Sequence, residues 1–232
     1  MKSHFTHLYI STILVTILLL FVGCTKENEP EFIEEIVETA PCAAQNIEFT
    51  LLNDSFKSIP YIKEKTLIFT DSLNNEISLE FSPKKRTFYT TQGSINCALD
   101  NSKKTTINAK IDTFEFDLTS NNAIDLSILF RLQAVIGFDK DSVFVRDMLD
   151  IITFPKAGGS NISQLNIQVN QRTNYYFNKS NNFHNSVESI QLNGKTYYDV
   201  FYDHGVDNLY YNYELGLVAF RDKSKKLWVL KN

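Results

Sequence analysis

The chain has 232 residues, 43% of them hydrophobic and 22% charged, a globular composition that excludes a largely disordered protein and suits one sizeable domain. The formal net charge of −4 is concentrated near the amino terminus, because six glutamates lie between residues 24 and 41. Without these six glutamates and the two lysines Lys2 and Lys26, residues 42–232 hold 21 acidic and 21 basic residues. This balance excludes the broad basic surface that binding to nucleic acid or to an anionic membrane would need.

The first 24 residues have the order of an export signal. Lys2 gives a basic start, a run of apolar character extends from Leu8 to Val22, and Gly23-Cys24 follows. These 15 residues suit a signal-peptide core and fall short of the roughly 20 that span a bilayer as a helix. The segment Leu20–Cys24 resembles the lipobox, the cleavage motif of bacterial lipoproteins. The resemblance implies that residues 1–23 are removed and that Cys24 carries the lipid.

Residues 24–41 are predicted to form an acidic tether, since they hold charged residues and few side chains that need burial. The stretch after Cys24 is similar to the Lys-plus-acidic tag of surface-exposed lipoproteins of the Bacteroidota, which implies the outer membrane and allows display on the cell surface. Acyl chains on Cys24, at about 0.8 kcal/mol per buried methylene, make the membrane the first expected partner. The alternatives are an uncleaved anchor helix and ordinary secretion.

Two further cysteines remain, Cys42 and Cys97. An even pair in an exported protein favours a disulfide, which would close a long loop and stabilise the fold by roughly 4 kcal/mol in the chain-entropy model. Two buried free thiols are the alternative, because a sequence gives no distance between them.

Residues 42–232 are predicted to form a single all-β domain. Apolar side chains alternate with polar ones in four runs: Ile77 to Phe81, Phe114 to Leu118, Leu126 to Leu132 and Leu165 to Val169. Turn residues separate the runs at 71–75, 120–122, 158–161 and 178–182, and Asn193-Gly194 gives the clearest hairpin signal. Helical periodicity is nearly absent, and Val145 to Ile152 is the one segment where we expect a short helix. Strands joined by turns predict an antiparallel sandwich or a curved up-and-down sheet with little helix.

The last 40 or so residues carry a second resemblance. Asn193-Gly-Lys-Thr-Tyr197, Tyr210-Tyr211, Gly216-Leu-Val-Ala-Phe220 and Trp228 fall in the same order as in the closing segment of many small Bacteroidota lipoproteins. The resemblance implies the same address and a β fold. The residues themselves predict an aromatic three-strand meander, in which Trp228 is a core anchor.

Residues for catalysis or metal binding are sparse. His184 and His204 are the histidines after residue 23, and His204 lies between Asp203 and Asp207. Such a histidine can act as a base or a metal ligand, but these residues suit a polar loop equally well, and we favour the loop.

Two carboxylate pairs, Asp139 with Asp141 and Asp147 with Asp150, could bind calcium or act as acid and base, and we favour solvated loop charges. The common hydrolase and phosphate-binding motifs are missing from the sequence. We therefore predict no catalytic residue, no metal site and no cofactor.

Tyrosine is the enriched residue with a functional option, and Tyr198, Tyr202, Tyr211 and Tyr213 are the candidate ligand-binding residues. Tyrosines on an exposed sheet face could bind a glycan or a protein, because the ring is apolar and the hydroxyl polar. Cross-strand pairing within an aromatic sheet is the alternative.

The leading hypothesis is a lipid-anchored, non-enzymatic binding or accessory protein of the outer envelope. A carrier or sensor of an apolar ligand, held in a cavity of the sheet, is the second hypothesis. An envelope hydrolase that uses His204 with Asp203 or Asp207 is the third.

Overall fold

The computed structural model describes residues 42–61, 64, 66–97, 99–120, 124–138, 143–171, 184–203 and 208–231. All of them belong to the second of two compact units, Val37–Asn232. The lipobox, Cys24 and the tether lie outside the described residues, and so do Asp139, Asp141, His204 and Asp207. Within the described ranges, no helix has both the length and the hydropathy needed to cross a membrane.

The described part consists of strands and one short 3-10 helix. In chain order these are β1 (Gln45–Phe49), η1 (Asn53–Ser58), β2 (Thr66–Thr70), β3 (Glu76–Phe81), β4 (Lys85–Cys97), β5 (Asp100–Ser120), β6 (Ser127–Phe138), β7 (Val143–Phe154), β8 (Ser163–Gln171), β9 (His184–Leu192), β10 (Lys195–Asp203), β11 (Leu209–Asn212), β12 (Gly216–Arg221) and β13 (Leu227–Leu230). The prediction of an all-β fold with little helix is confirmed.

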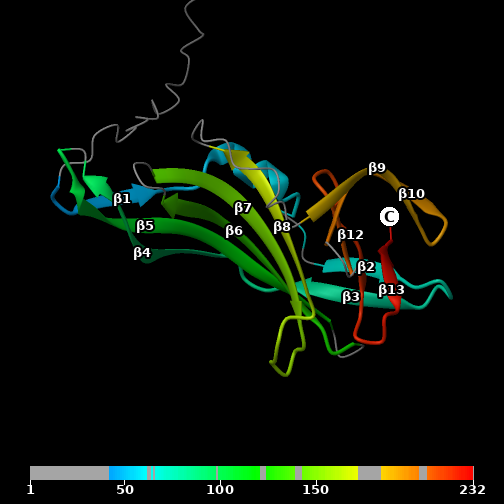
Figure 1. Cartoon of the computed structure of the whole chain (residues 1–232). Helices are drawn as coiled ribbons and strands as arrows, with labels where there is room; N and C mark the ends of the chain where they lie inside the picture. Colours follow the sequence, from blue (N-terminus) through cyan, green and yellow to red (C-terminus); the bar gives the residue numbers. More distant parts are fainter. Residues whose placement is uncertain are drawn as a thin grey trace, which may run out of the picture. The chain divides into compact units, whose positions relative to one another are not determined.

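The strands form one continuous, curled sheet. Its order is β8-β7-β6-β5-β3-β2-β13-β12-β11-β10-β9, and β1 and β4 pair with β5 off this path. Every pair is antiparallel except β1 with β5, which is parallel. The long strands β5 to β8 bend together (Figure 1). The curl brings β8 against β10 and β11, where the Ser163 hydroxyl donates to Asp203. Of the two predicted architectures, the curved sheet is the one observed.

Strand β5 has 21 residues and changes its buried face part-way along. In its first half the odd-numbered side chains Ile107, Ala109 and Ile111 are buried, whereas in its second half the even-numbered Phe116 and Leu118 are buried. Side chains alternate across a strand, so the buried face of β5 changes between its two halves. Ile107 packs in a small cluster with residues of β1, β4, β6 and β7, whereas Ala109 and Ile111 join Phe116 and Leu118 in the main core.

The small cluster around Ile107 brings five strands together. Ile107 of β5 packs with Ile47, Ile95, Phe138 and Val143, which come from β1, β4, β6 and β7. The Phe138 ring lies on the bare backbone of Gly93 in β4, where a Cβ atom would overlap the ring. Glycine therefore allows the end of β6 to cross β4 closely.

Residues 51–61, here called the plug, fill the concave side of the curled sheet. Leu51, Ile59 and Tyr61 are buried there in the main core. The Tyr61 ring lies 5.2 Å from Phe81 and 5.6 Å from Phe130, measured between ring centroids. The plug therefore occupies, with its own side chains, the space that a curved sheet would otherwise enclose.

Buried carboxylates hold the backbone of the plug. The Leu51 amide donates to Asp112 Oδ2 at 2.9 Å, and the Leu52 amide donates to Asp147 Oδ2 at 3.0 Å. The Ser55 hydroxyl donates to the same Asp147 oxygen at 2.5 Å. Buried N–H groups that do not pair with a neighbouring strand need other acceptors. These two aspartates supply acceptors to the plug in place of the hydrogen bonds that a strand would receive from its sheet.

The β9–β10 hairpin turns at Asn193 and Gly194, which have φ of 47° and 78°, so the hairpin prediction is confirmed. It packs on the side of β11 to β13 that faces away from the main core, forming a second core of Leu192, Tyr197, Val200, Tyr210, Val218, Ala219 and Val229. The Lys195 ammonium and the Tyr197 hydroxyl both donate to the Leu230 carbonyl. Both faces of the carboxy-terminal meander are thereby buried, and Trp228 is a buried anchor, as predicted.

The predicted helix from Val145 to Ile152 is wrong, because these residues lie inside strand β7. Asp147 and Leu149 point to the concave side, while Met148 and Asp150 point to the convex side, and all four are buried. A strand that is buried on both faces does not show period-two alternation of hydrophobicity, so its apolar positions imitated a helical spacing.

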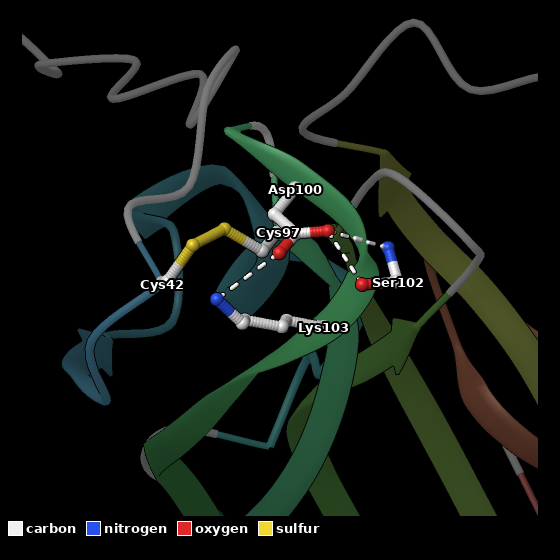
Figure 2. Close-up of a disulfide and its surroundings, with 5 residues drawn as sticks. All are labelled: Cys42, Cys97, Asp100, Ser102 and Lys103. Carbon is white, nitrogen blue, oxygen red and sulfur yellow. Dashed lines mark hydrogen bonds and ion pairs between the residues drawn. A yellow bond between two sulfur atoms is a disulfide. The ribbon is translucent and has the colours of Figure 1, made fainter.

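Cys42 and Cys97 are joined by a disulfide with a Cα–Cα distance of 5.0 Å, across 55 positions of sequence (Figure 2). Cys97 is the last residue of β4, so the bond fastens the start of the described chain to the β4–β5 hairpin. Asp100 organises the hairpin turn by accepting from the Ser102 amide at 3.0 Å and pairing with Lys103 at 3.1 Å (Figure 2). The free-thiol alternative is therefore not what the structure contains.

Candidate functional site

An open groove with a volume of about 760 Å³ lies between β10 and the turn that joins β11 to β12. Its apolar lining consists of Tyr197, Tyr198, Phe201, Tyr213 and Leu215, and Lys195, Thr196, Asp199, Asn212 and Glu214 add polar groups. We call it the Tyr198 groove. It combines aromatic ring faces with hydrogen-bonding groups at one surface.

A kink in β10 creates one wall of this groove. Asp199 has φ of 50°, in the left-handed region that residues other than glycine adopt at some cost. As a result Tyr198 and Asp199 are both exposed, between the buried Tyr197 and Val200, which breaks the alternation of the strand. The kinked backbone thus points two neighbouring side chains to solvent where a regular strand would expose one.

Asn212 fixes the opposite wall. Its side-chain amide donates to the Tyr198 carbonyl at 2.7 Å, and its side-chain oxygen accepts from the amides of Glu214 at 2.7 Å and Leu215 at 2.9 Å. One buried asparagine therefore ties the kink of β10 to the β11–β12 turn. Since the contacts on both sides come from one side chain, the spacing of the two walls is set by the fold rather than by a ligand.

The aromatic rings of the groove differ in how firmly they are held. Tyr213 packs against Phe201 at 4.9 Å and against Tyr211 at 6.4 Å between ring centroids. Burial raises the pKa of Tyr213 to about 12, so its hydroxyl remains protonated at physiological pH. Tyr198 is 65% exposed. The groove therefore presents one anchored ring and one ring that is open to solvent.

The four tyrosines predicted from the sequence separate into two pairs. Tyr198 and Tyr213 line the groove. Tyr202 stacks on its cross-strand neighbour Tyr210 at 6.4 Å, the pairing arrangement that was the alternative to ligand binding. Tyr211 is fully buried, its hydroxyl donates to the Ser58 carbonyl, and burial raises its pKa well above the usual value. Tyr211 is therefore a core residue that holds the plug.

Sequence reasoning did not single out the polar residues of the groove. The role of Asn212 could have been predicted, because an asparagine side chain commonly accepts hydrogen bonds from the backbone amides two and three residues later and so forms a turn. Asp199 had none, since nothing in its neighbours announces a left-handed conformation within a strand. Glu214 and Leu215 belong to the turn between β11 and β12, which was expected only as a connection between strands of the aromatic meander.

A second open groove, of about 580 Å³, lies beside β2 and β3. It is lined by Glu64, Thr66, Glu80, Phe81 and Lys84, among others. The Lys84 ammonium donates to the Tyr61 carbonyl and so forms part of the attachment of the plug. With a single aromatic ring, this groove offers less surface to an organic ligand than the Tyr198 groove does.

The prediction that Asp147 and Asp150 are solvated loop charges is wrong, because both are buried within strand β7. They do not form a joint site either, since their side chains lie on opposite faces of the strand. Asp147 binds the plug, whereas Asp150 accepts from Gln133 at 2.7 Å and from Asn166 at 2.5 Å on the convex side. Burial raises the pKa of Asp150. Within the part of the chain that the structure describes, no three histidine, cysteine or carboxylate side chains gather as a metal site would require.

Asp203, the described member of the His204 hypothesis, is fully buried. Its Oδ1 accepts from the amides of Asn208 at 2.7 Å and Leu209 at 3.0 Å, and its Oδ2 accepts from the Ser163 hydroxyl. These contacts give Asp203 a structural role, in which it joins the end of β10 to the start of β11 and to β8.

Comparison with known proteins found no matching family model, no matching curated protein and no matching solved structure.

Proposed function

We propose that this chain is a lipid-anchored protein of the bacterial cell envelope, held at the outer membrane by acyl chains on Cys24, and that it binds an oligosaccharide in the Tyr198 groove without catalysing a reaction. The observation that carries the proposal is the groove itself, in which exposed and anchored aromatic rings stand beside carboxylates.

The chemistry of the groove suits a sugar. A pyranose ring has an apolar C–H face that packs on an aromatic ring and hydroxyl groups that need hydrogen-bond acceptors. Tyr198 and Tyr213 supply the ring faces, and the exposed carboxylates of Asp199 and Glu214 supply acceptors. The groove does not suit an anionic ligand, because the single ammonium group in its lining, that of Lys195, stands against the two carboxylates of Asp199 and Glu214.

The envelope address is supported by the disulfide as well as by the lipobox. Disulfides persist in oxidising compartments and are rare in the cytosol. The bond between Cys42 and Cys97 therefore fits an exported domain, which is what cleavage and lipidation at Cys24 would produce.

The two other hypotheses are less well supported. A carrier of an apolar ligand would need space inside the curl of the sheet, and Leu51, Ile59 and Tyr61 of the plug fill the concave face. A hydrolase built on His204 would draw on Asp203, whose two oxygens already accept three hydrogen bonds within the fold.

The test is a binding screen of the purified mature protein on an array of immobilised bacterial and host oligosaccharides. Tyr198→Ala and Tyr213→Ala should each weaken the binding of any array hit about tenfold or more, which corresponds to roughly 1.4 kcal/mol. Tyr89→Ala is the matched control, because Tyr89 is also an exposed strand tyrosine, in β4, outside the groove. The proposal fails if the array gives no hit, or if the hits bind both groove variants as tightly as the wild type.

A further inference from the structure

The disulfide determines which end of the domain is nearest the tether. The tether ends at residue 41, and the next residue, Cys42, is bonded to Cys97 at the end of β4 (Figure 2). Strand β5 begins at Asp100, so the bond lies at the tip of the β4–β5 hairpin. The chain therefore enters the domain at this tip, and any anchor that precedes Cys42 pulls the tip toward itself.

The tip has side chains that suit a lipid headgroup region. Leu99 is 83% exposed, the most exposed large hydrophobic residue of the described part. Lys103 and Lys104 follow on β5, both exposed, while Asp100 is the acidic residue beside them. Lys104 donates to Asn96 at 2.5 Å, which leaves its positive charge unneutralised. Lys103 pairs with Asp100 at 3.1 Å, so the tip carries one net positive charge, that of Lys104. An exposed leucine beside a net positive charge is a combination that suits insertion between anionic headgroups.

The tether is short compared with the domain. Cys24 and Cys42 are 18 positions apart. A random-coil chain of 18 residues has a root-mean-square end-to-end distance of roughly 25 Å. A compact domain of about 190 residues has a radius of gyration of about 16 Å, which corresponds to a diameter of roughly 40 Å. The domain is therefore wider than the typical reach of the tether. The end that contains Cys42 is therefore the end that most often meets the bilayer.

We propose that the β4–β5 hairpin tip rests on the outer-membrane surface, with Leu99 between the headgroups and Lys103 and Lys104 beside anionic phosphates. The inference rests on the proposed lipid anchor at Cys24. Because the anchor already holds the tip at a high local concentration of lipid, even a contact too weak to recruit a free protein is populated. The contact would orient the domain on the membrane rather than attach it.

The test measures depth in the bilayer at the tip. Leu99→Trp is prepared in the lipidated full-length protein and reconstituted in vesicles of phosphatidylcholine and phosphatidylglycerol with brominated acyl chains, which quench nearby tryptophan fluorescence. Leu73→Trp is the matched control, because Leu73 is 78% exposed in the β2–β3 turn, far from the hairpin tip along the sheet (Figure 1). The native Trp228 is buried, and the wild type measures its contribution.

We expect most of the added emission at position 99 to be lost and that at position 73 to be unchanged. Adding Lys103→Glu and Lys104→Glu to Leu99→Trp should restore part of the emission. Equal quenching at positions 99 and 73, or none at either, in protein that floats with the vesicles would overturn this inference and leave the anchor intact. Protein that does not float with the vesicles would overturn the anchor as well.

Discussion

Replacing Tyr61 with phenylalanine tests whether the plug is fastened as the structure describes. The Tyr61 hydroxyl is fully buried and accepts from the Leu217 amide at the start of β12. Together with the bond from the Tyr211 hydroxyl to the Ser58 carbonyl, it links the plug to the carboxy-terminal meander. Tyr61→Phe keeps the ring and removes this acceptor. An unsatisfied buried amide costs about 1–3 kcal/mol, so the free energy of unfolding should fall by that amount.

The assay is urea denaturation followed by far-ultraviolet circular dichroism. With a slope of about 2 kcal/mol per molar urea, the midpoint should move down by roughly 1 M. Tyr61→Ala, which also removes ring contacts with Phe81, Phe116 and Phe130, should cost about 3–5 kcal/mol in total.

Tyr198→Phe is the control, since its hydroxyl belongs to a side chain that is 65% exposed, and its effect should stay within about 0.5 kcal/mol. A Tyr61→Phe protein as stable as the Tyr198→Phe protein would refute the argument that the plug depends on this hydrogen bond.

Three further predictions follow from other contacts. Replacing Cys42 and Cys97 together by alanine should lower the free energy of unfolding by about 4 kcal/mol, from the loop of 55 positions that the bond closes; a loss below 1 kcal/mol in urea titrations would contradict this. Cys24→Ser should abolish incorporation of labelled fatty acid and release the protein from the membrane fraction; unchanged fractionation would exclude the anchor. Burial alone would raise the pKa of Asp71, but hydrogen bonds from Asn75 and Lys226 hold this pKa well below its usual range. The ionised carboxylate therefore stabilises the fold at any pH above its unfolded pKa of about 3.9, and this stabilisation is lost as the pH falls below that value. Asp71→Asn should therefore flatten the acid limb of stability against pH, and an unchanged limb would argue against that role.

Period-two patterns were sufficient to predict the class of the fold. The alternation in Ile77 to Phe81 and in Phe114 to Leu118 corresponds to β3 and the second half of β5, and Asn193-Gly194 forms the predicted hairpin turn. These features are local, because side-chain direction along a strand and the left-handed turn both follow from neighbouring residues.

Features that depend on contacts distant in sequence could not be predicted. The plug has no periodic pattern of hydrophobic residues, and its position is set by hydrogen bonds to Asp112 and Asp147. These aspartates lie 61 and 95 positions along the chain from the amide groups that donate to them. The same limit applies to the tyrosines. Tyr211 is buried and Tyr198 is exposed because the β9–β10 hairpin and the plug cover particular faces of the meander. The spacing of the tyrosines in the sequence does not indicate which faces are covered.

The disulfide also determines how the domain would respond to mechanical force. A pull on the tether reaches Cys42 and passes across the sulfur bridge to Cys97, so the intervening residues, including the plug and strands β1 to β4, form a closed loop that cannot be drawn out lengthwise. The load then falls on β5, which is hydrogen-bonded to β1, β3, β4 and β6. Under the proposed anchor at Cys24, a force on the tether would thus act on the most extensively paired strand of the described part, and the residues between Cys42 and Cys97 would not unravel first.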